Sequence, residues 1–439
     1  MPPKRTAVGI TLLAWLSLLL ASLIWGFSLL DSLDRPSVGN ALEQRQLELN
    51  LLAIQGKQSP IIEKLVEKNP TQLLLEAVQK SSTASSSESL LEQGLLELQL
   101  GKSTAAKLHF ESVASNGSPQ QQSLAKALLR PEASEQLPPL PERPIYRLLS
   151  CKALAKPTNL CVAPPLIEQA KTRLILVSLL PLAGVVAGVL LLGRLLWQIW
   201  RHRLNAAPEL LGPGLSLMET VFVVAGGFVV LGEVIVPLVA MPLVSKLISL
   251  LPLEAAASSG AVVMGLYSFT AIPALLLIWA FKGKDLQWNP SWNAIGQGFR
   301  GLLLALPLVA LVGWVVEQIW PQAGGSNPLL EQVLDSRNGT ALALLAITAV
   351  VLAPLFEELL FRGLLLPVLG GYWGNFAGVV ISALVFALAH LSLSEAAPLF
   401  VLGLGLGWVR LRSGNLSSCV VMHGLWNGLT FFNLIMLGS

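Results

Sequence analysis

The sequence predicts an all-α polytopic membrane protein with about nine transmembrane helices and an N-terminal extramembrane helical domain. Three observations predict this fold class. Of the 439 residues, 53% are hydrophobic and 13% are charged, whereas soluble domains carry about a quarter charged residues. Long uncharged apolar runs recur, and each can span the roughly 30 Å hydrocarbon core as a helix. Between the first two runs lies a polar segment, residues 31–172, in which no run can cross a bilayer.

The first apolar run, Ala7 to Leu30, follows the basic residues Lys4 and Arg5. A cleaved signal peptide has the same basic start, but its apolar region is shorter and ends at a small-residue cleavage site. Because this run is long and no such site follows, we interpret residues 1–30 as an uncleaved signal-anchor helix. A cleaved signal peptide is the alternative.

The segment 31–172 is rich in Leu, Gln, Ser, Glu and Lys and predicts a small helical domain that ends in a Pro-rich linker at Leu137–Pro144. Two amphipathic helices, Ser89–Leu100 and Thr104–Val113, resemble a tetratricopeptide-type hairpin. A single hairpin is weak evidence for such a repeat, because these repeats need about three copies to be stable. We therefore describe the domain only as TPR-like.

The second apolar run, Leu174–Trp200, is followed at once by Arg201, His202 and Arg203. Basic residues before the first run and after the second place both of these ends in the cytoplasm under the positive-inside rule. The 31–172 domain would then be extracytoplasmic. Cys151 and Cys161 can form a bridge in such an oxidising compartment, and two unpaired thiols are the alternative.

Further apolar runs continue to the end of the chain, and basic residues flank several of them. The predicted spans are Leu217–Val239, Gly260–Phe281 (before Lys282 and Lys284), Gly301–Trp320 (after Arg300), Thr340 into the Glu357 region, Asn375–Leu391, Pro398–Val409 (before Arg410 and Arg412) and Ser417–Leu437. We assign residues 173–330 to a set of transmembrane helices and residues 331–439 to a further transmembrane domain.

Ionisable side chains inside apolar helices are rare because they are costly to bury, so each one is a candidate functional residue. Residues 354–363 contain Glu357, Glu358 and Arg362. On a helix, Glu358 and Arg362 are at i,i+4 and can pair, whereas Glu357 is rotated by about 100°. Glu357 can therefore stay free to act as a general base toward water. Alternatively, the three residues mark a helix end at the interface. Other glutamates in or near spans, to which we assign no role, are Glu219, Glu233 and Glu317.

Two more elements have i,i+4 spacing: Phe386 with His390, and His423 with Asn427. A His–Asn pair on one face can donate hydrogen bonds to a developing oxyanion. Taken singly, each element is also explained by a structural histidine or by interhelical polar contacts. The chain has four histidines, and two of them fall in apolar segments near the glutamate pair. Independent structural explanations for all three elements are hard to sustain together.

The ordered elements Glu357-Glu358-xxx-Arg362, Phe386-xxx-His390 and His423-xxx-Asn427 resemble the motifs of the CPBP family. This family comprises the CAAX prenyl endopeptidases and related bacteriocin-processing and immunity proteins. The flanking stretches "EELLFRG" and "SALVFALAHL" are similar as well. The resemblance covers about residues 340–437 and leaves residues 31–172 outside it.

The resemblance implies a metal-independent glutamate peptidase that needs no cofactor and cleaves a peptide or membrane-protein substrate. Glu357 would activate the attacking water with help from His390. His423 and Asn427 would stabilise the tetrahedral oxyanion. One glutamate and two histidines can also bind zinc, although the HExxH zinc signature and the GxSxG nucleophile elbow are absent from the sequence.

The same resemblance implies that Glu358 and Arg362 organise the first motif helix.

If each helix crosses the membrane once, His390 lies late in a span that leaves the cytoplasm, and His423 lies early in its own span. The two depths do not obviously coincide. We therefore expect short or broken helices around Glu395, which membrane proteins tolerate where the backbone lines a protein cavity.

Two other function classes compete with the peptidase. One is a non-proteolytic CPBP-like membrane scaffold or bacteriocin-immunity protein, and the other is a transporter, which internal inverted repeats would favour. We find no such repeats. The expected partners are a peptide or membrane-protein substrate, the lipid bilayer and a protein partner of the 31–172 domain. The net charge of +3 gives no reason to expect nucleic acid. A signal anchor with a large exported domain is typical of a bacterial plasma membrane or an organellar equivalent.

Overall fold

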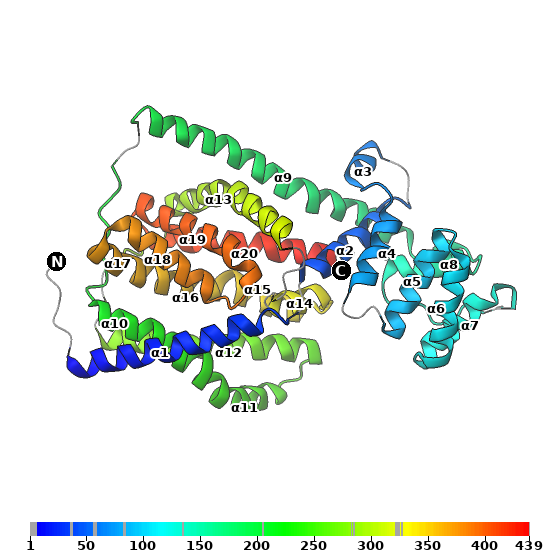
Figure 1. Ribbon diagram of the computed structural model, residues 1–439, viewed down its shortest axis with the longest axis horizontal. Helices are drawn as coiled ribbons and strands as arrows, with labels where there is room; N and C mark the ends of the chain where they lie inside the picture. The colour runs from blue at the N-terminus through cyan, green and yellow to red at the C-terminus, as the bar shows by residue number, and fades with distance from the viewer. Residues whose placement is uncertain are drawn as a thin grey trace. The chain divides into compact units, whose positions relative to one another are not determined.

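The fold was examined in a computed structural model, which describes residues 7–35, 38–55, 59–81, 85–133, 136–203, 206–281, 283, 286–320, 325 and 328–438. All regular elements among these residues are helical (Figure 1). The chain divides into a first unit, residues 1–38 with 183–439, and a second unit, residues 39–182. The predicted topology signals Lys4, Arg5, Lys282 and Lys284 lie outside the described residues.

Seven helices among the described residues are long and apolar enough to cross a membrane. The shortest has 23 residues, and at 1.5 Å per residue this exceeds the roughly 30 Å hydrocarbon core. The chain is therefore a multi-pass integral membrane protein, as its composition predicts. The seven are α1 (Val8–Asp31), α9 (Pro164–Trp200), α10–η3–α11 (Leu217–Val221, Phe222–Ile235, Val236–Ser249), α12 (Ala255–Ala280), α13 (Trp292–Ile319), α15–η4–α16–η5–α17 (Gly339–Ala346, Ile347–Leu352, Ala353–Glu358, Leu359–Leu365, Leu366–Trp373) and α20 (Leu416–Gly438).

The predicted count of about nine spans included two segments that are not among these seven. Helix α18 (Asn375–Leu388) has 14 residues, about 21 Å of helix, and is too short for a full crossing. Helix α19 (Leu393–Ser413) carries Glu395, Arg410 and Arg412. A short helix, α14 (Pro328–Asp335), precedes the glutamate helix. The interruption between α18 and α19 corresponds to the broken helix expected around Glu395.

Helices α13, α19 and α20 pack against one another, and α18 lies between α17 and α19 (Figure 1). Glycines allow these close approaches. A Cβ on Gly403 of α19 would lie 2.9 Å from Cβ of Ala383, and one on Gly378 of α18 would lie 2.9 Å from the backbone of α17. Small residues at such interfaces let membrane helices pack backbone to backbone. These contacts place the motif-bearing helices α16, α18 and α20 around a common core.

In the part that the structure describes, the second unit contains seven short helices and two 3₁₀ turns before the first part of α9. They are α2 (Val38–Ala53), α3 (Pro60–Leu65), α4 (Pro70–Lys80), α5 (Ser87–Gln99), α6 (Ser103–Asn116), α7 (Pro119–Leu129), η1 (Pro131–Ala133), α8 (Pro144–Ala153) and η2 (Thr158–Leu160). Helices α5 and α6 form the predicted hairpin, in which Gly94 leaves room for the ring of Phe110. The Pro-rich stretch does not end the unit, because α8 follows it. The predicted boundary at residue 172 falls inside the continuous helix α9.

A disulfide and a buried ionic cluster hold the second unit together. Cys151 is bonded to Cys161. Arg143 Nη1 lies 2.8 Å from Glu48 Oε1 and 3.4 Å from Glu92 Oε1. Burial raises the pKa of Glu92 to about 8, against the smaller opposing effect of Arg143. Arg143 therefore pairs chiefly with Glu48, and Glu92 is largely protonated at neutral pH.

Candidate active site

The glutamate pair lies between two stretches of wider, π-helical turns. The backbone N–H of Ala353 donates to the carbonyl of Thr348, and that of Leu366 donates to Phe361, each five residues back. Glu357 and Glu358 end the short α-helical segment α16 between them. π-Turns inside α-helices occur frequently at functional sites, where they re-aim side chains. Here they flank the two carboxylates directly.

Glu358 is fully buried and shared by two helices. Its Oε1 accepts a hydrogen bond at 3.0 Å from Arg362 Nη1 and lies 2.9 Å from His423 Nδ1. Arg362, also fully buried, donates from Nη2 to the carbonyl of Gly403 at 3.0 Å and stacks 4.4 Å over the ring of Phe386. The predicted Glu358–Arg362 pair is thus present. Its contacts with Gly403 and His423 also join α16 and η5 to α19 and α20.

Glu357 is more accessible and less occupied than its neighbour. Its side chain is 16% exposed, compared with 0% for Glu358. The hydroxyl of Tyr267 on α12 donates to Oε1 at 3.1 Å. Oε2 has no hydrogen-bond partner among the described residues and lies 3.9 Å from His423 Nε2. Glu358 Oε2 also has no partner among the described residues, but Glu358 is fully buried, so Glu357 is the carboxylate that a water molecule can reach.

His423 lies between the two carboxylates. The Glu358 carboxylate already accepts from Arg362, and an ionised carboxylate can only accept, so His423 Nδ1 is the donor to it. The other ring nitrogen, Nε2, faces Glu357 Oε2 across 3.9 Å. At this distance the two atoms form no hydrogen bond. One proton, carried by either of them, leaves Glu357, Glu358, Arg362 and His423 with no net charge, which favours the arrangement in an apolar interior.

His390 lies just beyond the end of α18, in the turn before α19. Its Nδ1 lies 2.8 Å from the carbonyl oxygen of Phe386. A carbonyl can only accept, so Nδ1 carries the proton and Nε2 is left as an acceptor in the neutral ring. The ring of Phe386 contacts both histidine rings, with centroids 4.7 Å from His390 and 5.5 Å from His423. No hydrogen bond or ion pair joins His390 to Glu357 among the described residues.

The N-terminal segment fixes the turn that carries His390. Arg35 donates from Nη2 to the carbonyl of Leu391 at 2.6 Å, and the backbone N–H of Leu393 donates to Ser32 Oγ at 3.3 Å. Leu391 has a positive φ of 52°, a conformation that a bulky residue adopts only when its surroundings impose it. The segment that follows α1 therefore supports the site, a role that the signal-anchor interpretation did not include.

Asn427 faces the same side of α20 as His423, as its i,i+4 spacing predicts. Its Nδ2 donates to the carbonyl of Ala349 in the π-helical stretch η4 at 2.8 Å. One amide hydrogen therefore serves an interhelical contact, the alternative raised for this motif. An amide nitrogen has two hydrogens, so one remains for a ligand.

Two residues near the site, Tyr267 and Trp25, were not identified from the sequence, and Glu233 was noted there without a role. Tyr267 bonds Glu357, and Trp25 Nε1 of α1 donates to Glu233 Oε2 at 2.9 Å. Glu233 is close enough to Glu357 to interact electrostatically. Tyr267 is one of three tyrosines in the chain, and a phenol within an apolar run needs a polar partner. That requirement was the signal available in the sequence.

Arg410, predicted as one of the basic residues that follow a span, is not exposed at the surface of the protein. The side chain is fully buried. Its Nε donates to the carbonyl of Arg362 at 3.1 Å and its Nη2 donates to Gln287 Oε1 at 2.7 Å. The wide turns of η5 free the Arg362 carbonyl from its ordinary helical partner, and the buried guanidinium satisfies it.

A cavity of about 310 Å³ lies beside Glu357. Tyr267, Ser268, Ala271 and Leu275 of α12 form one wall, and Leu352, Leu355, Phe356 and Leu359, from the stretch that contains Glu357, form the other. The lining is apolar except for two hydroxyl groups. Such a cavity suits a hydrophobic side chain or a hydrocarbon chain.

The described side chains of the site do not provide a set of metal ligands. Within the described ranges, no three His, Cys, Asp or Glu side chains form a group that could hold a metal ion. His390 is turned to a backbone carbonyl, and His423 Nδ1 is turned to Glu358. The donor set that zinc would need is therefore not assembled by the residues present.

Comparison with known proteins identifies two segments of the chain. Residues 339–429 match the family described as type II CAAX prenyl endopeptidase Rce1-like, and residues 39–171 match a domain family of unknown function. An Escherichia coli protein named "Uncharacterized 24.3 kDa protein" is 34% identical over 103 residues, which are 22% of this chain and 48% of that protein. The chain thus spans about half the length of this curated relative. No solved structure matches the chain.

Proposed function

Since residues 339–429 are similar to the type II CAAX prenyl endopeptidases, which confirms the family resemblance seen in the motifs, we propose that this protein is an intramembrane endopeptidase that uses Glu357 to activate water. The observation that carries the proposal is the unequal environment of two adjacent carboxylates. Each carboxylate keeps one oxygen without a hydrogen-bond partner among the described residues. Glu358 is fully buried and its other oxygen contacts the cationic Arg362 as well as His423, whereas Glu357 is 16% exposed and its other oxygen accepts only from the neutral Tyr267.

In the proposed reaction, Glu357 Oε2 takes a proton from a water molecule as the water oxygen attacks the scissile carbonyl carbon. The carbonyl electrons move to its oxygen and form a tetrahedral oxyanion. Collapse of this intermediate breaks the C–N bond, and the protonated Glu357 gives its proton to the leaving amine. Tyr267, which bonds the other oxygen, fixes the orientation of the base.

The oxyanion needs donors that are already in place. His423 Nε2 is such a donor when it carries the proton that it shares with Glu357, and the ion pair of Glu358 and Arg362 holds the ring in position through Nδ1. Asn427 supplies its second amide hydrogen from one turn further along α20. His390, with Nε2 free to accept, assists in holding the water. The roles of Asn427 and His390 both require movement or a bridging water, because neither side chain bonds Glu357.

The apolar cavity beside Glu357 supports a substrate with a hydrophobic segment near the cleaved bond. A prenyl group and a transmembrane peptide segment both meet this description. A cleavage assay should therefore compare three substrates: a farnesylated peptide, the same peptide without the lipid, and a hydrophobic peptide.

We also propose that residues 39–171 are extracytoplasmic and serve to bind a protein partner or substrate. The bond between Cys151 and Cys161 supports this side of the membrane, because disulfides persist in oxidising compartments. A bacterial plasma membrane or an organellar equivalent fits this arrangement. An alkaline-phosphatase fusion at Ser85 is expected to be active, because the enzyme folds only outside the cytoplasm. An inactive fusion at Ser85 together with an active fusion at Asn415 would show the opposite orientation of the protein in the membrane.

The peptidase proposal is tested with the purified full-length protein and the three peptides. Cleavage is expected to disappear in Glu357→Ala, to fall strongly in His390→Ala, and to survive a strong chelator. Retained cleavage in Glu357→Ala would overturn the mechanism. Loss with chelator that zinc reverses would support the metal alternative. Absence of cleavage of any peptide by the folded wild-type protein would favour the non-proteolytic scaffold.

A further inference from the structure

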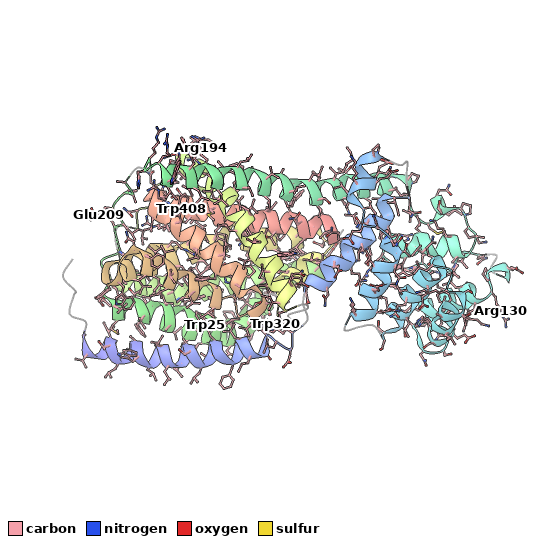
Figure 2. All side chains as sticks on the ribbon, turned by 45° about the horizontal axis from the view of Figure 1, so that its top comes forward. Trp25, Arg130, Arg194, Glu209, Trp320 and Trp408 are labelled. Carbon is pink, nitrogen blue, oxygen red and sulfur yellow. A yellow bond between two sulfur atoms is a disulfide. The ribbon has the colours of Figure 1, made fainter. Side chains whose placement is uncertain are left out.

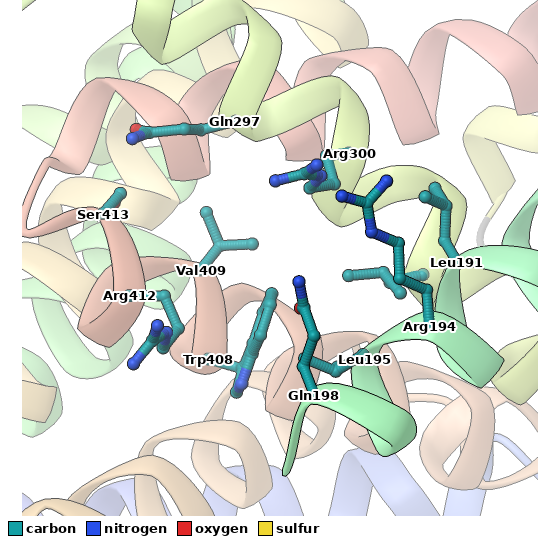
Figure 3. A pocket seen from close by; sticks show the side chains of 11 residues that line it. Leu191, Arg194, Leu195, Gln198, Gln297, Arg300, Trp408, Val409, Arg412 and Ser413 are labelled. Carbon is teal, nitrogen blue, oxygen red and sulfur yellow. The ribbon is translucent and has the colours of Figure 1, made fainter. Parts of the chain in front are cut away.

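A second cavity, of about 330 Å³, lies among α9, α13 and α19, away from the glutamate pair. Three arginines line it, one from each helix: Arg194, Arg300 and Arg412. Figure 3 shows Arg194 extending from α9 toward Arg300 of α13. The remaining polar lining comes from the side chains of Gln198, Gln297 and Ser413.

The charge in this cavity is not balanced. None of the residues that line it is acidic. Neither Arg194 nor Arg300 forms an ion pair or a side-chain hydrogen bond with any residue that the structure describes, whereas Arg362 near Glu357 bonds through both of its Nη atoms. The guanidinium groups of Arg194 and Arg300 therefore repel each other without a carboxylate between them. An anion bound between these two arginines removes that repulsion and accepts hydrogen bonds from their N–H groups.

The cavity lies near the basic end of α9. Figure 2 shows Arg194 and Trp408 on the same side of the first unit, near that end. Seven residues beyond Arg194, the guanidinium of Arg201 lies 5.7 Å from the ring of Trp200, and that of Arg203 lies 5.5 Å from Trp197. Tryptophans with arginines at the end of a membrane helix are typical of the lipid headgroup level.

The rest of the wall is apolar. Leu191, Leu195, Leu304 and Val409 line the cavity together with the ring of Trp408. A binding site that combines guanidinium groups with aliphatic side chains fits an amphiphile with an anionic head and a hydrocarbon part. A basic pocket between transmembrane helices at this level is typical of a site for anionic lipid headgroups.

We propose that this cavity binds a phosphate group, with Arg194 and Arg300 as its principal ligands and Arg412 as a third positive charge. Guanidinium groups match the oxygen geometry of phosphate through paired N–H donors. The aliphatic wall favours the phosphodiester of an anionic phospholipid, and a soluble phosphate ester has the same recognising chemistry. A filled site would join α9 to α13 and α19 and so brace the helices that pack on α20.

The test uses the purified full-length protein and native mass spectrometry, which counts the lipid molecules retained. Short-chain phosphatidylglycerol, short-chain phosphatidylcholine and glycerol phosphate are titrated separately into the wild type and into Arg194→Gln/Arg300→Gln. The matched control is Arg201→Gln/Arg203→Gln. It also removes two positive charges, but both are at the end of α9 and outside the cavity. Arg194→Lys and Arg300→Lys are assayed singly, so that the test survives poor folding of the double variant.

Phosphatidylglycerol is expected to bind the wild type and the control with equal affinity and to bind each single variant about tenfold more weakly, as expected for loss of one charge-assisted contact. Phosphatidylcholine is expected to bind far more weakly. Glycerol phosphate binding as tightly as phosphatidylglycerol would assign the site to a soluble phosphate ester. Equal binding of all ligands by the cavity variants and the wild type, or an equal loss in the control, would overturn the proposal.

Discussion

The ion pair between Glu358 and Arg362 gives the sharpest stability prediction. Arg362 forms a 3.0 Å hydrogen bond to Glu358, another of 3.0 Å to the Gly403 carbonyl, and a 4.4 Å contact with the Phe386 ring. Both members of the pair are fully buried. Removing one member of a buried pair leaves the other charge uncompensated, at a cost of about 3–5 kcal/mol. We expect Arg362→Met to destabilise the first unit by this amount.

The double variant Glu358→Gln/Arg362→Met separates the effect of the unpaired charge on stability from the effect of lost packing. Glu358→Gln leaves the Arg362 charge uncompensated in the same way, but the amide oxygen still accepts from Arg362 and His423, so its cost is expected at the lower end of this range, about 3 kcal/mol. In Glu358→Gln/Arg362→Met no buried charge remains unpaired, so the loss is expected to be smaller than the sum of the two single losses by about 2 kcal/mol. Arg337→Met, at an exposed arginine, serves as the control and should change stability by less than about 0.5 kcal/mol.

Tryptophan fluorescence during reversible unfolding in mixed detergent micelles measures these differences. All twelve tryptophans lie outside residues 39–182, so the signal reports the first unit alone. Additive losses, within about 0.5 kcal/mol, would refute the argument that the two charges depend on each other.

Three further predictions concern the base, a buried acid and the disulfide. Tyr267→Phe removes the donor to Glu357 Oε1 and is expected to lower kcat about tenfold with KM unchanged; an unchanged kcat would exclude an orienting role. Because the pKa of Glu92 rises from 4.5 to about 8 on folding, protection of α5 against hydrogen exchange, corrected for intrinsic rates, should fall as the pH rises through that window. Glu92→Gln should abolish this dependence, and an unchanged pH profile in the variant would assign the effect to another group. Cys151→Ser/Cys161→Ser is expected to destabilise the second unit by about 2–3 kcal/mol, the loop-closure value for its ten-residue separation, measured by hydrogen exchange of α8; unchanged protection there would contradict it.

The sequence predicted the features that depend on local spacing. The pair of Glu358 with Arg362 and the common face of Phe386 with His390 follow from helical geometry alone. The hairpin of α5 and α6 likewise follows from two short amphipathic repeats joined by a glycine. These features need only the helical period of 3.6 residues, which is the same in every protein.

Features that depend on distant segments were not predictable. Tyr267 lies 90 residues before Glu357, and Arg35 lies 356 residues before Leu391. Arg410 has the sequence context of an interfacial arginine, yet it fills a gap left by π-turns that composition does not reveal. The contact of His423 with Glu358 comes from another helix, 65 residues further along the chain. One sequence gives no measure of such tertiary partners.

In the proposed mechanism the two adjacent glutamates divide their tasks, with Glu357 reacting and Glu358 holding the site together. The most direct measurement compares Glu357→Gln with Glu358→Gln in the same purified protein, recording kcat and unfolding stability for each. Glu357→Gln is expected to lower kcat by about 10²–10⁴-fold, the usual contribution of a general base, with stability close to wild type. Glu358→Gln is expected to lower stability first. Retention of most activity by a stable Glu357→Gln protein would contradict the account.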